Sequence, residues 1–284
     1  MTNNIIICGQ GHGIECVYRG LRQNRQPFIL CTEDASQKEK AVAEGVPVVT
    51  HYAQAIQSAN DIVLTASYKP KITRQDLACA RFLNIHYALL PKYRGMHAIV
   101  WAMLNGESHV GFTLHQTSEL LDQGAVIYQE AVPIADKTSW ELMMIIDELV
   151  SFRIYDALKD YAEGRITPTP QNEEDAIFVA PRNQEDCRVR WDEWNAQFFS
   201  RALRALVPPY PLPFFEHNGK KIEIESASVI PKNYIEINGH LVYVDNDSIY
   251  IKIPEGLLCV EMVRVDGVQM QANQFFTRIG VRFT

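Results

Sequence analysis

The sequence predicts an α/β protein in two parts, an N-terminal part built on a parallel sheet and a smaller, β-rich C-terminal part. Up to Gly164, short apolar strands alternate with helical segments, which is the pattern of a sheet with crossover helices. After a Pro-rich stretch at residues 167–170, short alternating strands follow one another, separated by turns such as Asn218-Gly219. We therefore expect one domain over residues 1–186 and a second over residues 187–284.

Composition limits the classes of function. The 284 residues are 47% apolar, enough for a sizeable core, and 27 Lys and Arg face 34 Asp and Glu, a net charge of −7. This balance opposes broad binding to nucleic acid or to an anionic membrane. The six cysteines form no C-x-x-C pair and no zinc spacing, so we expect no metal and a reducing, cytoplasmic compartment. We predict neither a signal peptide nor a membrane span.

The chain opens with a β-α-β pattern of Rossmann type. A buried strand at residues 4–8 leads into a G-x-G-x-G run at residues 9–13, a helix at 14–24 and a strand at 28–31. With Glu33 after the second strand, a dinucleotide site is one interpretation. The other is that the glycines allow close strand–helix packing, and that His12 is a solvated loop residue.

The remaining elements of the first part alternate in the same way. We expect helices at 36–44, 73–80, 98–104 and 139–163, and strands at 46–49, 62–66, 82–86, 111–116 and 125–132.

The second part begins with a helix capped by Asp192 or Asn195 that reaches residue 206, where a Pro-rich segment stops it. Strands are expected at 214–216, 221–228, 234–237, 241–245, 249–253 and 256–265. These short strands predict a small β barrel or an open sheet. A final strand and a capped helix are expected in residues 267–280.

Three polar residues are the candidates for chemistry. Asn84 and His86 alternate at the carboxyl end of the strand predicted at 82–86, so they share one face at the edge where open α/β sheets bind ligands. Asp122 follows in a second polar segment. An amide and an imidazole side by side can bind one small carbonyl group, and a carboxylate can orient and charge the imidazole.

The surrounding residues carry a resemblance to a known family. The chain reads N-I-H at residues 84–86, L-L-P-K-Y-R-G at 89–95 and L-D-Q-G at 121–124. It resembles the 10-formyltetrahydrofolate-dependent formyltransferases, which carry N-x-H, then S-L-L-P-x-Y-x-G, then L-D-x-G. Ala88 stands where the family has serine. The resemblance implies a Rossmann-like formyltransferase domain followed by a smaller, β-rich, OB-like domain.

The resemblance also implies roles for residues. Asn84, His86 and Asp122 would be catalytic, acting on direct attack by an amine, with 10-formyltetrahydrofolate as donor and no metal. The segment at 65–69 and the loop at 89–95 would line the folate pocket, which makes the following residues candidates for binding the donor: Tyr68, Leu89, Leu90, Pro91, Tyr93 and Gly95. Taken singly, each could be ordinary packing or a strand-end hydrogen-bonding group, and His115 is best interpreted as a core histidine.

The acceptor amine is chosen by exclusion among those the family uses. The chain is too long for the purine enzyme, which resembles only the first domain. Residues 187–284 carry eleven basic and eleven acidic residues, and the segment at 31–45 lacks the basic insertion of the tRNA-acting relatives. The remaining acceptor is an amino deoxysugar linked to dTDP or UDP, as in bacterial polysaccharide biosynthesis. The alternative function is that of a methionyl-tRNA formyltransferase. An NAD-dependent oxidoreductase is a less favoured alternative.

Arg201, Arg204 and Tyr210 are the candidates for binding this nucleotide sugar, because a guanidinium suits a diphosphate and an aromatic ring suits a base. A solvated helix face and a core tyrosine explain them equally well. The neutral second domain has apolar strands, and the sugar-acting relatives commonly form dimers. We therefore expect a homodimer, with no nucleic-acid or membrane partner.

Overall fold

The computed structural model describes residues 4–284 and divides into two compact units. The first unit comprises the chain up to Ile99, together with His109–Pro133 and Glu141–Ala180. The second comprises Val100–Ser108, Ile134–Trp140 and Pro181–Thr284. Each unit is described by itself below.

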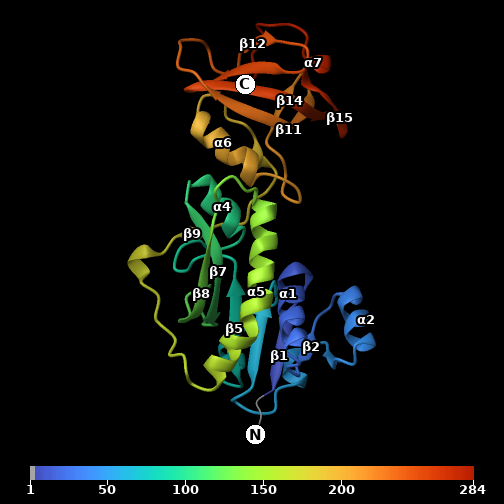
Figure 1. Cartoon of the computed structure of the whole chain (residues 1–284), viewed down its shortest axis with the longest axis vertical. Coiled ribbons are helices and arrows are strands. Elements are labelled where there is room, and N and C mark those ends of the chain that lie inside the picture. The colour runs from blue at the N-terminus through green and yellow to red at the C-terminus, as the bar shows by residue number, and fades with distance from the viewer. Residues whose placement is uncertain (1–3) are drawn as a thin grey trace. The chain divides into compact units, whose positions relative to one another are not determined.

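The first unit contains a seven-stranded sheet in the order β3-β2-β1-β4-β5-β7-β8 (Figure 1). The five strands from β3 to β5 are parallel, whereas β7 and β8 are antiparallel additions at the β5 edge. The strands are β1 (Ile5–Gly9), β2 (Ile29–Cys31), β3 (Val48–Val49), β4 (Ile62–Ala66), β5 (Arg81–His86), β7 (His109–Gln116) and β8 (Val126–Pro133). This order confirms the predicted parallel sheet.

The helices that begin in or belong to this unit are α1 (Gly11–Gln23), α2 (Ala35–Ala43), α3 (Arg74–Leu77), α4 (Ala98–Leu104) and α5 (Ser139–Ala162), with short 3-10 turns at η1 (Tyr52–Gln54) and η2 (Glu173–Asp175). Two very short strands, β6 (Arg94–Gly95) and β9 (Phe178–Val179), form a separate parallel pair. Helix α1 begins at Gly11, three residues before the predicted start, so part of the glycine run lies inside its first turn. Helix α3 is a single turn, shorter than predicted, with a capping box between Thr73 and Asp76.

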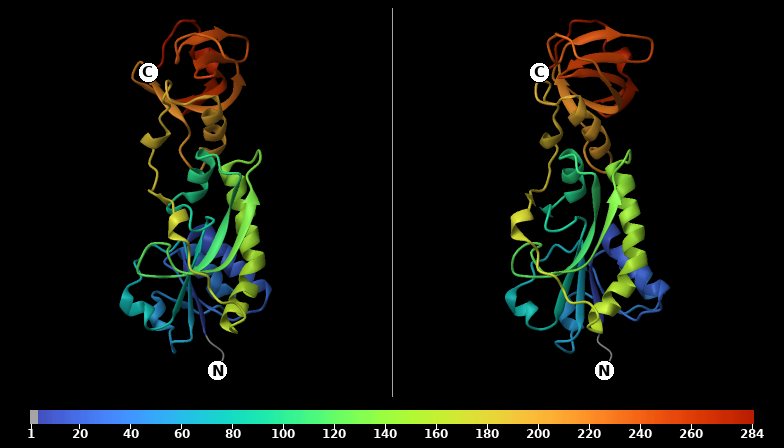
Figure 2. Two further views of the ribbon diagram at one scale, coloured as in Figure 1. Left: turned by 90° about the vertical axis from the view of Figure 1, so that its left-hand side faces the viewer. Right: turned by 60° about the vertical axis from the view of Figure 1, so that its left-hand side comes forward.

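Helices α1 and α5 pack closely on one another (Figures 1 and 2). Helix α5 buries Leu142, Ile146, Val150 and Ile154 along one stripe, each at most 1% exposed. Gly20 of α1 faces this helix, since a Cβ added there would lie 2.4 Å from the Ser151 carbonyl oxygen. The missing side chain at Gly20 is what allows the two helices to approach.

The second unit is an antiparallel sheet in the order β10-β11-β14-β13-β12, with β15 paired to β14. Its strands are β10 (Phe214–His217), β11 (Lys220–Pro231), β12 (Leu241–Val244), β13 (Ile249–Ile253), β14 (Gly256–Val265) and β15 (Val268–Gln271). Its helices are η3 (Glu185–Cys187), α6 (Ala196–Ala205) and α7 (Ala272–Phe275). The predicted β-rich unit is confirmed, with β13 and β14 at their predicted bounds.

The core of the second unit is aromatic. The ring centroid of Phe215 lies 5.2 Å from that of Trp191 and 4.7 Å from that of Phe283, and all three side chains are buried. Helix α6, whose N-cap is Asn195, packs against β11 and β14. One predicted strand, at residues 234–237, is wrong. This segment follows the end of β11 at Pro231 and exposes all four side chains, so its alternation has no sheet to bury against.

We predict that Gly20→Ala destabilises the protein, although alanine is normally the better helix former. The new methyl group would be forced against Ser151 and Ile154 of α5, and overpacking of this kind costs about 1–3 kcal/mol. Urea unfolding would measure the free energy of unfolding. Gln23→Ala at an exposed position of the same helix is the control, and equal stability of the two variants would contradict the close approach.

Candidate active site

Three polar side chains form a row across the carboxyl ends of neighbouring strands. In the sheet register, Asn84 of β5 pairs with Thr65 of β4 on one side and with His115 of β7 on the other. Directly paired residues project from the same face, so their side chains meet. Thr65 Oγ1 donates to Asn84 Oδ1 at 2.8 Å, and Asn84 Nδ2 lies 3.1 Å from His115 Nε2.

This row fixes how the Asn84 amide is turned. Its oxygen accepts from Thr65, so its NH₂ group faces His115. His115 Nε2 then accepts, and His115 Nδ1 carries the proton that it donates to the Gln116 carbonyl oxygen at 2.8 Å. The bond to His115 uses one of the two N–H groups of the Asn84 amide.

His86 lies two residues further along β5. Its Nε2 donates to the Tyr93 carbonyl oxygen at 2.8 Å, and its Nδ1 lies 3.9 Å from Asp122 Oδ2. The side chains of His86 and Asp122 are only 11% and 10% exposed. The hydrogen bond to Tyr93 therefore orients the ring so that its other nitrogen faces the carboxylate.

Asp122 lies in the loop between β7 and β8 and completes the group. Its Oδ2 accepts from the backbone N–H of Gly95 at 2.9 Å, and its Oδ1 is 3.8 Å from His115 Nε2. The backbone of Asp122 has a φ of 54°, the left-handed region that non-glycine residues rarely adopt. The structure thus brings the three predicted catalytic residues together from two separate segments.

His115 belongs to this group although sequence reasoning placed it in the core. It is buried as predicted, 2% exposed, but it also contacts both Asn84 and Asp122. Burial lowers the pKa of the His115 imidazole to about 4, against the opposing effect of the Asp122 charge. A signal was present in the sequence, because His115 sits near the end of the strand that pairs with β5.

The loop predicted to bind folate contributes through its backbone. Tyr93 supplies the carbonyl that holds His86, and Gly95 supplies the N–H that holds Asp122. Leu90 is buried and its N–H donates to Thr113 Oγ1 at 3.2 Å. Leu89 and Pro91 are half-buried.

Tyr68, the remaining residue predicted to bind folate, follows the end of β4 and is half-buried. Its ring packs against Tyr52 with a centroid distance of 6.2 Å. Its role in donor binding stays a prediction.

The residues predicted to bind a nucleotide belong to the second unit. Arg204 donates through Nη1 to the Ala135 carbonyl oxygen and through Nε to the Ser200 carbonyl oxygen at 3.3 Å. Arg201 packs its guanidinium against Gly106, and Tyr210 is half-buried beyond the end of α6. Their nucleotide-binding role stays a prediction.

The glycine run has packing reasons of its own. A Cβ at Gly9 would lie 1.8 Å from the Ala66 carbonyl oxygen, so this glycine lets β1 lie against β4. Asp34 is the N-cap of α2, accepting from the Gln37 N–H at 3.1 Å, and Gln37 Nε2 donates to the Gly11 carbonyl oxygen at 3.1 Å. Gly9 and Asp34 thus have packing and capping roles that require no bound dinucleotide.

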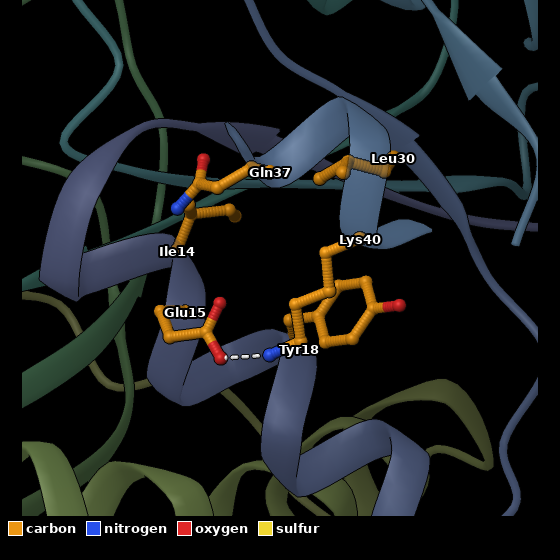
Figure 3. Close-up of a pocket in the computed structure, with 6 residues that line it drawn as sticks. All are labelled: Ile14, Glu15, Tyr18, Leu30, Gln37 and Lys40. Carbon is orange, nitrogen blue, oxygen red and sulfur yellow. Dashed lines mark hydrogen bonds and ion pairs between the residues drawn. The ribbon is translucent and has the colours of Figure 1, made fainter. Parts of the chain in front are cut away.

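A pocket lies next to this run, between α1 and α2 over β2 (Figure 3). Lys40 pairs with Glu15 across it and lies 5.0 Å from the centroid of the Tyr18 ring. Its charged lining residues are therefore already paired with one another, and we assign no ligand to it.

Two further features concern residues 4–284 as a whole. No group of three or more His, Cys, Asp or Glu side chains in that range is arranged to hold a metal ion. Nor does any helix there combine the length and apolar character needed to cross a membrane.

Comparisons with known proteins identify the family of this chain. The family model described as "Formyl transferase" matches residues 3–147, and "Formyl transferase, C-terminal domain" matches residues 182–280. The methionyl-tRNA formyltransferase of Alkaliphilus oremlandii is 26% identical over 93% of this chain and 83% of its own length. That of Deinococcus radiodurans is 30% identical over 80% and 70%.

Solved structures share the fold. An N-formyltransferase from Helicobacter canadensis, in complex with folinic acid and dTDP-3-aminofucose, has a TM-score of 0.71 at 16% identity, covering 92% of this chain and 99% of that one. HypX from Aquifex aeolicus, in complex with tetrahydrofolic acid, has a TM-score of 0.65 at 18% identity. The match covers 96% of this chain but 46% of HypX, so this chain spans about half of that protein. With both of its parts matched by the family's models, the chain belongs to the formyl transferase family and is a transferase of formyl groups.

Proposed function

We propose that this protein transfers a formyl group from 10-formyltetrahydrofolate to the amino group of an amino deoxysugar linked to dTDP or UDP. The observation that carries the reaction is the convergence of Asn84, His86 and Asp122 at the carboxyl end of β5. The donor is the one implied by the family resemblance, and relatives of the same fold have been solved with folates.

The geometry assigns a role to each group. The free N–H of Asn84 donates to the formyl oxygen, where negative charge develops as the amine attacks. His86, whose Nε2–H is bound to Tyr93, accepts the proton of the attacking amine on Nδ1. Asp122, 3.9 Å from that nitrogen, stabilises the resulting imidazolium. His86 then returns the proton to the leaving nitrogen of the folate.

His115 takes part as a neutral residue. It can accept a hydrogen bond from Asn84 only while its Nε2 is unprotonated. Burial keeps the pKa of this imidazole low, so the acceptor is present at neutral pH. His115 thereby keeps the Asn84 amide turned toward the substrate.

The charges of the second unit favour a small acceptor over tRNA. Several basic side chains of this unit have acidic partners: Arg188 pairs with Glu185 and Glu216, and Arg264 with Glu225. The pairs Arg190–Glu193, Lys220–Asp266 and Lys221–Glu223 follow the same pattern. Paired and alternating charges do not make the basic stripe expected of a tRNA-binding face.

The connection between β2 and α2 supports the same acceptor. Only Thr32, Glu33 and Asp34 separate these elements, and Asp34 is the cap of the helix. There is no room in three residues for a basic insertion. A nucleotide sugar needs instead a few polar and aromatic side chains, for which Arg201, Arg204 and Tyr210 are our candidates.

Methionyl-tRNA is the second candidate acceptor. The curated relatives that match over most of this chain are methionyl-tRNA formyltransferases, at 25–30% identity. The catalytic residues would serve either amine in the same way, so only the acceptor decides between the two functions.

A cytoplasmic homodimer acting in polysaccharide biosynthesis stays our proposal for the cellular setting. Leu241 of β12 and Leu258 of β14 turn into the core of the unit, whereas Tyr243 on the edge strand β12 is 57% exposed. β12 is the last strand in the sheet order, and the part of its outer edge beyond Leu241, whose backbone bonds to Gly280 and Val281, is the surface that we would test first for self-association. Cys8, Cys16, Cys31, Cys79, Cys187 and Cys259 are free, as expected in a reducing compartment.

We predict that Asn84→Ala lowers kcat about 100- to 1000-fold, the cost of losing one oxyanion donor. His86→Ala and Asp122→Ala should lose activity to a similar degree, because proton transfer from the amine fails. Binding of folinic acid, measured by calorimetry, should persist and show that the site is folded. Glu119→Ala, an exposed acid near Asp122, is the control, and near-normal turnover by His86→Ala would refute the assignment.

We predict formylation of an amino-sugar nucleotide in a competition between acceptors. The protein and 10-formyltetrahydrofolate would be incubated with dTDP-3-aminofucose and a set of UDP- and dTDP-linked 3- and 4-amino sugars, and separately with charged initiator tRNA. Mass spectrometry would detect the gain of one formyl group. Modification of the tRNA and of no sugar would mean that the chemistry is right and the acceptor wrong.

We predict a loss of stability on acidification that depends on His115. The pKa of this imidazole is about 4 in the folded protein and near 6.5 in an unfolded chain. Between these values the unfolded state binds more protons, so the free energy of unfolding should fall as the pH drops from about 6.5 to 4. His115→Gln should flatten this part of the profile in urea unfolding, whereas the exposed His51→Gln should not.

A further inference from the structure

Arg94 is a fully buried cation that touches no proposed catalytic side chain. It follows Tyr93 and precedes Gly95, and its side chain is 0% exposed. Its Nη1 and Nη2 donate to the two carboxylate oxygens of Glu173 at 2.7 and 2.8 Å. Its Nε and Nη2 also donate to Gln171 Oε1, at 3.1 and 2.7 Å. A buried guanidinium requires such complete pairing.

Gln171 connects Arg94 to Asp122. Because the cation holds the oxygen of its amide, the NH₂ group must face the opposite way. That Nε2 donates to the carbonyl oxygens of Asp122 and Gly124, both at 2.7 Å. Gln171 therefore binds the backbone of the β7–β8 loop on either side of Gln123.

The hydrogen bond from Gln171 supports an unfavourable backbone conformation at Asp122. A left-handed conformation is unfavourable for a non-glycine residue and persists only where its surroundings impose it. The carbonyl of Asp122 is held by Gln171 and its carboxylate by the Gly95 N–H. Both contacts come from groups next to or bonded to Arg94.

The backbone joins the same two segments. The N–H of Arg94 donates to the Ile177 carbonyl oxygen at 2.8 Å, and β6 pairs in parallel with β9. A Cβ at Gly95 would lie 2.1 Å from the Val179 carbonyl oxygen. The segment after α5 is thus paired through its backbone with the loop at residues 89–95.

We propose that Gln171, itself oriented by Arg94 and Glu173, is a positioning residue that sets the Asp122 carboxylate between His86 and His115. This proposal rests on the catalytic role proposed above for Asp122. If Gln171 served stability alone, its loss would lower the unfolding midpoint and leave the turnover of the folded protein unchanged.

The first measurement is steady-state kinetics of the full chain with 10-formyltetrahydrofolate and the acceptor that the competition identifies. Gln171→Ala should lower kcat about 10- to 100-fold, the effect of misplacing a catalytic group by about 1 Å. The KM for the donor should change less than about 3-fold, because the interaction acts in the transition state. Glu173→Gln, a milder variant, should lower kcat less. Glu174→Gln, the exposed neighbouring acid, should leave it unchanged.

A double-mutant cycle with Asp122→Asn decides whether Gln171 acts through Asp122. Adding Gln171→Ala to Asp122→Asn should cost no further activity, since the group being positioned is already disabled. A full additional loss would overturn the proposal. Wild-type kcat in Gln171→Ala would also overturn it. If Asp122→Asn itself retained full activity, the proposed catalytic role would fail first, so the two failures are distinguishable.

A spectroscopic readout needs no acceptor. The imidazole Cε1–H signals of His86 and His115, assigned with His86→Gln and His115→Gln, report on the nearby carboxylate. Gln171→Ala should shift both signals in the folded protein, as Asp122→Asn does, whereas Glu174→Gln should shift neither. Unchanged signals in a folded Gln171→Ala protein would refute the positioning role.

Discussion

The position of the Asp122 carboxylate between two imidazoles is the constraint on which the site depends. Its oxygens lie 3.9 Å from His86 and 3.8 Å from His115, and none of the three side chains is more than 11% exposed. Electrostatic interactions are strong in such surroundings but depend on fixed geometry. The protein meets this requirement with backbone groups of Tyr93 and Gly95 and with one glutamine side chain, none of which changes charge during the reaction.

The sheet supplies the other half of the geometry. Because β5 lies between β4 and β7, the central residue Asn84 is flanked on the same face by Thr65 and His115. A shift of one residue in either register would turn the Asn84 amide toward apolar side chains. β4 is buried on both faces from Ile62 to Ala66, so Thr65 and its partner Asn84 lie in a closely packed part of the sheet. The sheet pairing thus determines where the Asn84 amide points.

Features with a local pattern were predictable from the sequence. Alternation placed Asn84 and His86 on one face, and turn residues bounded β13 and β14 correctly. Contacts between distant segments left no such pattern: Arg94 and Gln171 are 77 residues apart, and an arginine in a polar loop normally indicates a solvated residue. The strand predicted at 234–237 is wrong for the opposite reason: the segment has the alternating pattern but no partner strand. For His115 the strand pattern predicted burial correctly, but it gave no sign of the contacts with Asn84 and Asp122.

The acceptor is harder to infer than the reaction, for a physical reason. Formyl transfer makes the same demands on any amine: a donor for the oxyanion and an acceptor for one proton. In our proposal Asn84, His86 and Asp122 meet them within the first unit, whatever molecule carries the amine. Selection of that molecule rests on charge and shape elsewhere. The pairing of Arg188, Lys220 and Arg264 with acids in the second unit is our argument against a polyanion as large as tRNA. Relatives can therefore share the catalytic residues and differ in acceptor, which is why the sequence relatives and the fold relatives of this chain have names that point to different substrates.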